Sequence, residues 1–230
     1  MRVAVEVWRI DLATAPPMSA ADLEELSVDE RARHARYLVA EPARVFATTR
    51  IALRRLLGQR LGRPAAAVQI EAGVRGKPAL VGASQPFFNV SHGPGSALIA
   101  LCEVAQVGID VEGRTALAFD SPVAASICTA TEMAWIRLNR ASADITIARL
   151  WNRKEAVLKA AGLGLGQPMS ELDLGVPDAT AGICEASDLD RIAWKDLALP
   201  HTEVGAVAVL SDDASAITVA VRPYLSRHDR

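Results

Sequence analysis

The order in which extended and helical patterns follow one another constrains the fold of this 230-residue chain most strongly. A V-x-V-x-V alternation predicts a strand over 2–10, and apolar residues at helical spacing predict a helix over 43–61, closed by Gly62 and Pro64. The other predicted elements are strands over 87–90, 96–103 and 106–112, helices over 130–139 and 145–161, and strands over 204–210 and 216–221. Groupings of this order indicate an α+β protein rather than a doubly wound parallel sheet.

The composition is that of a soluble globular protein. Half of the residues are hydrophobic and 23% are charged, while apolar runs such as 97–102 and 204–210 are far too short to span a bilayer. The amino-terminal segment alternates like a strand and contains Glu6, so it does not resemble a signal peptide. The three cysteines are too scattered for a disulfide framework or a paired-cysteine metal site. We therefore expect a cytoplasmic enzyme with no membrane partner.

Charge is distributed unevenly, although the net charge is only −2. Nine arginines stand between residues 31 and 63, against the single acid Glu41. Such a segment is either a solvated helix face or a surface that meets an anion, such as a phosphorylated cofactor or an acidic protein. Nucleic acid is disfavoured as a partner, because the chain as a whole is slightly acidic and contains few aromatic residues for base stacking.

One candidate for chemistry is the segment VGIDVE, which ends a predicted strand. Alternate side chains of a strand share a face, so Asp110 and Glu112 point the same way, and Gly113 follows them directly. Two carboxylates this close repel each other unless a cation or a proton lies between them. The alternative is an edge strand with a solvated polar face.

A second candidate is the predicted helix that contains WNRKEAVLK. Trp151, Glu155 and Lys159 fall on one stripe of this helix, with Lys154 beside Glu155. The simple alternative is a helical ion pair between Glu155 and Lys159. Taken together, the two segments offer carboxylates for a divalent ion and lysines for phosphate oxygens, which indicates phosphoryl chemistry on a magnesium-bound substrate.

Two loops add weaker signals. Ser91 and His92 precede a Gly-Pro-Gly turn, where backbone amides can approach an anion, and Lys77 lies in a short basic loop before Pro78. Adjacent strand residues point apart, so Ser91 and His92 do not form a nucleophilic triad. Neither loop identifies a function alone.

Four motifs in this order resemble the 4′-phosphopantetheinyl transferases, and more closely their long, surfactin-synthetase-activating (Sfp-type) class. They are GKP at 76–78, FNVSH at 88–92, GIDVE at 108–112 and WNRKEAVLK at 151–159. The resemblance implies a pseudo-dimer of two similar α+β halves, here 1–104 and 105–230, with the active site in the cleft between them. It also implies a monomer.

The resemblance further implies a reaction. Such an enzyme transfers the 4′-phosphopantetheine arm of coenzyme A to a serine of an apo acyl or peptidyl carrier protein, and releases adenosine 3′,5′-bisphosphate. Asp110, Glu112 and Glu155 would hold Mg²⁺, and Lys159 would assist the leaving group, so Asp110, Glu155 and Lys159 are the implied catalytic residues. The residues implied to bind coenzyme A are Arg44, Arg50, Lys77, Ser91, His92, Asp110, Lys154 and Lys159.

Three questions stay open at this point. The base that deprotonates the carrier serine is Glu155 acting through a metal-bound water, or Glu132. The arginine-rich segment is expected to meet an acidic carrier protein, with Arg54 and Arg55 as the residues to test. The rival functions are a metal-dependent phosphohydrolase and an inactive module that binds carrier proteins.

Overall fold

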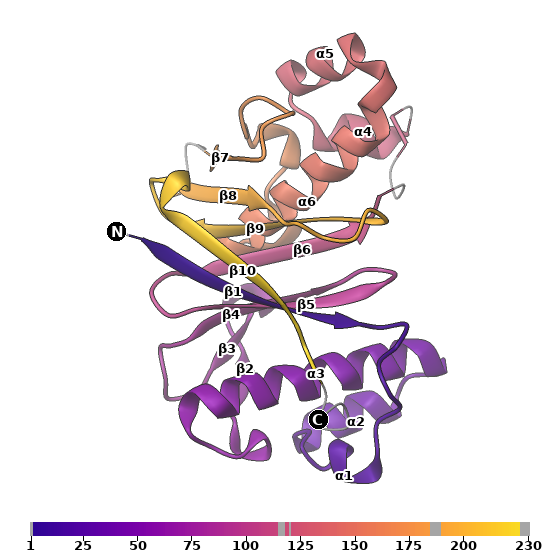
Figure 1. Cartoon of the computed structure of the whole chain (residues 1–230), viewed down its shortest axis with the longest axis vertical. Coiled ribbons are helices and arrows are strands. Elements are labelled where there is room, and N and C mark those ends of the chain that lie inside the picture. Colours follow the sequence, from indigo (N-terminus) through magenta and orange to yellow (C-terminus); the bar gives the residue numbers. More distant parts are fainter. Residues whose placement is uncertain (1, 115–117, 120, 185–189, 226–230) are drawn as a thin grey trace.

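Two four-stranded sheets lie against each other between two outer layers of helices in the computed structural model (Figure 1). The structure describes residues 2–114, 118–119, 121–184 and 190–225. The main elements of the first half are β1 (Val3–Asp11), α3 (Ala40–Leu61), β4 (Phe87–His92) and β5 (Ser96–Cys102). Those of the second half are β6 (Val107–Gly113), α6 (Ala143–Ala161), β8 (Ile192–Asp196) and β9 (Glu203–Leu210).

The two halves repeat one topology. In each, a strand leads through a long helix to two further strands, and the last of these pairs antiparallel with the first: β5 with β1, and β9 with β6. The remaining strand lies on the far side of the last one, which gives the matching orders β1-β5-β4 and β6-β9-β8. The predicted α+β pseudo-dimer is thereby confirmed.

The other elements decorate this repeat. In the first half they are α1 (Ala20–Leu23), α2 (Val28–Ala35), and the hairpin of β2 (Ile70–Ala72) and β3 (Pro78–Leu80). In the second they are α4 (Pro122–Ile127), α5 (Ala130–Leu138) and β7 (Ala181–Cys184). The last strand, β10 (Ile217–Pro223), pairs parallel with β1, so it extends the first sheet although it falls within the predicted second half. No helix among the described residues is long and apolar enough to cross a bilayer.

Several element boundaries differ by one to three residues from those predicted. Helix α3 begins at Ala40 rather than at 43, because Pro42 falls in the first turn, where a backbone N–H has no partner within the helix. Strand β4 continues through Ser91 and His92, which pair with Leu98 and Ala97 of β5. His92 therefore lies at the end of a strand rather than in a loop.

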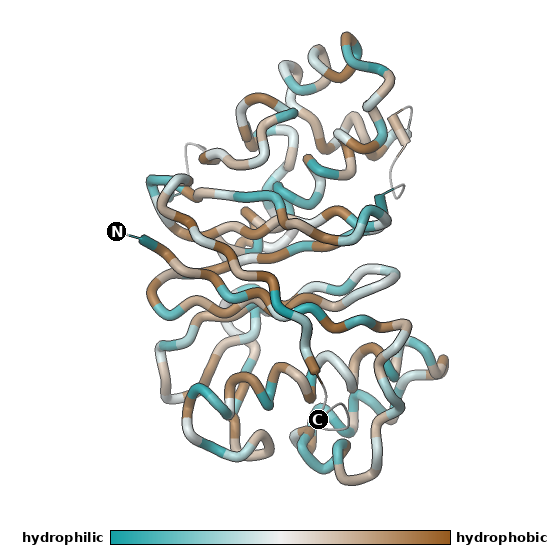
Figure 2. Tube along the Cα trace, viewed as in Figure 1, coloured by the Kyte–Doolittle hydropathy of each residue, from teal (hydrophilic) through white to brown (hydrophobic). Residues whose placement is uncertain are grey.

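Three hydrophobic clusters fill the spaces between the layers, and hydrophobic residues recur along the strands (Figure 2). One cluster joins α3 to the first sheet, another joins α6 to the second, and a third lies between the two sheets. A buried polar contact also links the halves: the Asn89 side-chain oxygen on β4 accepts a hydrogen bond of 2.9 Å from the backbone N–H of Ile109 on β6. This contact holds the β4 edge next to the strand with the acids.

Candidate active site

A cavity of about 300 Å³ lies where β4, β6 and α6 meet. Its lining residues are Val90, Ser91, His92, Asp110, Glu112, Trp151, Glu155 and Lys159. The two predicted segments and the predicted Ser-His pair therefore line one cavity. The strand phase points both acids of β6 into it, and the helical phase of α6 presents Glu155 and Lys159 from the other side.

Asp110 is the centre of the polar contacts in this cavity. Its Oδ1 accepts a hydrogen bond of 2.6 Å from the Lys159 ammonium and one of 2.8 Å from the Ser91 hydroxyl. Lys159 also lies 3.5 Å from Glu155 Oε2. The other Asp110 oxygen, Oδ2, is buried and accepts no hydrogen bond from any described residue. A buried carboxylate oxygen without a partner is costly unless a ligand satisfies it.

The charges of the cavity favour a divalent cation. Burial raises the pKa of Glu112, and the negative charges of Asp110 and Glu155 raise it further. Burial also raises the pKa of Glu155, although the Lys159 ammonium opposes this. Three carboxylates and one ammonium therefore share the site, and oxygen ligands of this kind suit Mg²⁺.

The three carboxylates have the right chemistry for Mg²⁺, but their side chains do not converge on one point in this structure. No group of three or more His, Cys, Asp or Glu side chains is close enough to hold a metal ion in the part of the chain that the structure describes. The Lys159 ammonium lies instead against both Asp110 and Glu155. The unsatisfied Asp110 oxygen is the observation that supports a cation here.

A larger cavity of about 620 Å³ adjoins the first through Val90 and His92, and contains residues that the motifs did not identify. Arg33 of α2 stacks on the ring of Phe46, with its guanidinium carbon 4.8 Å from the ring centroid. The predicted Arg50 lines the same cavity, 6.0 Å from that centroid, and Tyr37 stands beside it. Phe46 is one of the apolar residues at helical spacing that predicted the helix over 43–61. Two arginines around an aromatic ring suit a phosphorylated nucleotide.

Two residues predicted to bind coenzyme A, Lys77 and Arg44, donate their hydrogen bonds to protein groups instead. Lys77 donates to the side chain of Gln106 at 2.9 Å and to the backbone carbonyls of Val107 and Ala160 at 3.0 and 3.4 Å. Burial lowers its pKa to about 8. Lys77 thus joins the halves, and it is the next residue, Pro78, that lines the larger cavity.

Arg44 is the second predicted coenzyme A ligand that is bonded to protein groups. It donates to Glu41 at 2.6 and 2.9 Å and to the backbone carbonyl of Leu12 at 2.8 Å. The hydrogen bond with Glu41 raises the pKa of the guanidinium. Glu41 and Leu12 line the larger cavity, whereas Arg44 is not among its lining residues.

Lys154 and Glu132 lie apart from the cavity, against the roles expected for them. The Lys154 side chain is fully buried and donates to Glu132 Oε2 at 2.6 Å, to Ile127 O at 2.8 Å and to Met169 O at 3.0 Å. An ammonium has three N–H donors, so none is left for a phosphate. Glu132 is 1% exposed and also caps α5 by accepting from the Thr129 N–H. The structure therefore leaves Lys154 no N–H donor for coenzyme A, and it buries Glu132 away from the cavity.

Replacing Lys154 with methionine should lower the free energy of unfolding by about 3–5 kcal/mol, because Glu132 would remain buried without its counter-charge. The double variant Lys154→Met/Glu132→Gln should recover part of that loss, since neither group is then a buried unpaired charge. Urea unfolding measures both. A Lys154→Met protein with normal stability and weakened coenzyme A binding would indicate instead that Lys154 contacts coenzyme A.

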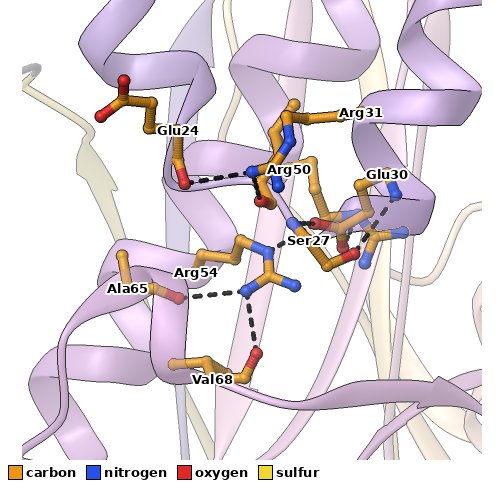
Figure 3. Close-up of polar contacts among 9 residues, drawn as sticks. Glu24, Ser27, Glu30, Arg31, Arg50, Arg54, Ala65 and Val68 are labelled. Atoms are coloured by element: carbon orange, nitrogen blue, oxygen red, sulfur yellow. Dashed lines mark hydrogen bonds and ion pairs between the residues drawn. The ribbon is translucent and has the colours of Figure 1, made fainter.

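Several arginines of the arginine-rich segment pair with acids from other parts of the chain. Arg54, 1% exposed, donates to Glu30 at 2.6 Å and to the carbonyls of Ala65 and Val68 (Figure 3). Arg55, whose side chain is 11% exposed, pairs with Asp22 and Glu25. Both guanidinium groups are paired within the fold, so neither is free in this structure to meet the acidic carrier protein expected as their partner.

Comparisons with known proteins agree with the motifs. The family model of the 4′-phosphopantetheinyl transferase superfamily matches residues 106–209. The chain is 32% identical over 212 residues to 4′-phosphopantetheinyl transferase HetI of Nostoc, across 89% of this chain and 87% of the relative. It is 27% identical over 242 residues to the L-aminoadipate-semialdehyde dehydrogenase-phosphopantetheinyl transferase of Mus musculus, across 96% of this chain and 76% of the relative. The chain belongs to the 4′-phosphopantetheinyl transferase superfamily.

Proposed function

We propose that this protein transfers the 4′-phosphopantetheine group of coenzyme A to a serine of an apo acyl or peptidyl carrier protein in a magnesium-dependent reaction, releasing adenosine 3′,5′-bisphosphate. The observation that carries the proposal is a pair of neighbouring cavities that share Val90 and His92 in their linings. One is lined by three carboxylates and Lys159, and the other by arginines around an aromatic ring. The names of the relatives support the transferred group. We expect a cytoplasmic monomer of the Sfp-type class.

The acidic cavity would hold the reacting groups. Asp110, Glu112 and Glu155 would hold Mg²⁺, which when bound neutralises charge on the coenzyme A pyrophosphate. Lys159, already within reach of Asp110, would stabilise the leaving phosphate. Glu155, acting through a metal-bound water, is the better candidate for the base. Its pKa is raised, and a general base works best when its pKa lies close to the pH of the reaction.

The larger cavity would take the nucleotide end of coenzyme A. Arg33 and Arg50 would contact a phosphate, and Phe46 offers an apolar face for the base. His92 lines both cavities, so it would lie between the nucleotide and the pyrophosphate, with Ser91 fixing Asp110 beside it.

The direct test is to incubate the protein with coenzyme A, Mg²⁺ and several apo carrier proteins, and to weigh the carriers. A mass gain of one phosphopantetheine group, dependent on the carrier serine, supports the proposal. Coenzyme A cleavage without a carrier would instead indicate a phosphohydrolase. Carrier binding without a mass gain, across several carriers, would indicate an inactive binding module.

Magnesium should stabilise the protein, and Glu112→Gln should weaken that effect. At a concentration about a hundred times its Kd, the ion should raise Tm by about 5–10 °C at pH 7.5. The increase should shrink at pH 5, because Glu112 and Glu155 have raised pKa values and there bind protons that compete with the cation.

Without magnesium, Glu112→Gln should be as stable as the wild type or slightly more stable. The raised pKa means that the ionised side chain is less favourable in the folded state than in the unfolded one, and the substitution removes this cost. The control is Glu71→Gln, which changes an exposed acid outside the cavity. Calorimetry with and without Mg²⁺ measures the Tm of the wild type, Glu112→Gln and Glu71→Gln. An equal increase of Tm with magnesium in these three proteins would exclude Glu112 as a ligand.

A further inference from the structure

Glu30 of α2 stands between two arginines of α3 with different surroundings (Figure 3). Arg54 is fully enclosed and makes three hydrogen bonds. Arg50 lines the larger cavity, with 19% of its side chain exposed, and its one ion pair is from Nε to Glu30 Oε1 at 3.4 Å. Arg50 makes no hydrogen bond with any described residue, so its terminal nitrogens remain available to a ligand.

The two oxygens of Glu30 have separate partners. Oε2 accepts from the Ser27 backbone N–H at 2.9 Å and from Arg54 Nε at 2.6 Å, which caps α2 and joins it to α3. Oε1 faces Arg50 Nε. An ion pair at Nε leaves both terminal nitrogens of the guanidinium able to bind a phosphate through two parallel hydrogen bonds.

We propose that Glu30 is a positioning residue that holds Arg50 so that its terminal nitrogens face an anionic group of the donor in the larger cavity. The inference rests on the proposed function, because it takes coenzyme A as the donor. Glu30 touches no substrate and acts only through Arg50. Burial lowers the pKa of Arg50 while the Glu30 charge opposes that effect, in keeping with a cation that lacks a full set of partners until an anion binds.

The variant Glu30→Gln separates the two tasks. The amide oxygen can replace Oε2 and keep both structural hydrogen bonds, since glutamine also serves in a capping box. Arg54 loses its counter-charge, so the Tm of this variant should fall. The amide NH₂ then faces Arg50 Nε. Because both groups are hydrogen-bond donors, they repel each other and the guanidinium turns away from residue 30. We expect the Kd for coenzyme A to rise about tenfold, the loss expected for one misaligned charge-assisted hydrogen bond, with kcat at saturating coenzyme A within about twofold of the wild type.

Two further variants serve as controls. Ser27→Ala removes the other half of the capping box without touching Arg50, so it should lower Tm and leave the Kd unchanged. Arg50→Lys keeps the charge and leaves the contacts of Glu30 with Ser27 and Arg54 intact, but it lacks the planar fork. It should weaken coenzyme A binding about as much as Glu30→Gln, and it tests the proposal even if Glu30→Gln does not fold.

Isothermal titration with coenzyme A decides between the outcomes. The proposal predicts that adding Glu30→Gln to Arg50→Ala causes no further loss of affinity. Glu30→Gln or Arg50→Lys proteins that bind as tightly as the wild type would overturn it, as would a full extra loss in the Arg50→Ala background. A wild-type protein that does not bind coenzyme A would overturn the proposed function itself, which distinguishes the two failures.

Discussion

Asp110→Asn should reduce phosphopantetheine transfer by about a thousandfold while leaving the fold intact. Asp110 is the most buried of the three cavity acids, accepts hydrogen bonds from Lys159 and Ser91, and has one buried oxygen without a partner. The amide keeps the shape and one acceptor oxygen, but it removes the negative charge that would attract a cation and that holds the Lys159 ammonium in place. Both contributions to the leaving phosphate are lost together.

Initial rates of carrier loading, followed by mass spectrometry, measure this effect. Asp212→Asn makes the same substitution at an exposed position away from the cavity, and should load carriers at the wild-type rate. Raising the magnesium concentration should recover little of the lost rate, since the missing charge belongs to the site. An Asp110→Asn protein within threefold of the wild type would remove Asp110 from the proposed machinery.

The geometry of this acid pair followed from the sequence because strand periodicity is local. Once 106–112 is a strand, Asp110 and Glu112 must share a face, and once 145–161 is a helix, Glu155 and Lys159 must share a stripe. The motifs then indicated that the faces meet. The repeated topology was predicted only through the family resemblance, because the repeat resides in strand order and not in residue similarity between the halves.

Long-range pairing could not be predicted from these patterns. Lys154 is adjacent to Glu155, yet helical geometry turns successive side chains by about 100°, so that one enters the core and the other the cavity. Which acid meets Lys154 depends on how α5 packs on α6. In the same way, local charge counting made the arginine-rich segment look unbalanced, because Glu30, Asp22 and Glu25 precede it or lie on other elements.

The packing of β6 on α6 also depends on one position that carries no chemistry. A Cβ atom added to Gly108 would lie 2.0 Å from the backbone oxygen of Ala156 and 2.4 Å from the backbone nitrogen of Ala160. Both contacts are with main-chain atoms, which cannot rotate away as a side chain could. Only glycine therefore lets the strand with Asp110 approach the helix with Glu155 this closely.

Gly108→Ala should accordingly lower the free energy of unfolding by about 3 kcal/mol or more, an overpacking cost at the upper end because backbone must move. Gly166→Ala is the matched control: its added Cβ would meet no atom within 4 Å, so its stability should change little. Urea unfolding compares the two. Any Gly108→Ala protein that remains folded must hold β6 farther from α6, which separates Asp110 from Lys159 and Glu155, so its loading rate should fall even under conditions where it is fully folded. Equal urea midpoints and equal rates for the two variants would contradict the view that this close approach builds the site.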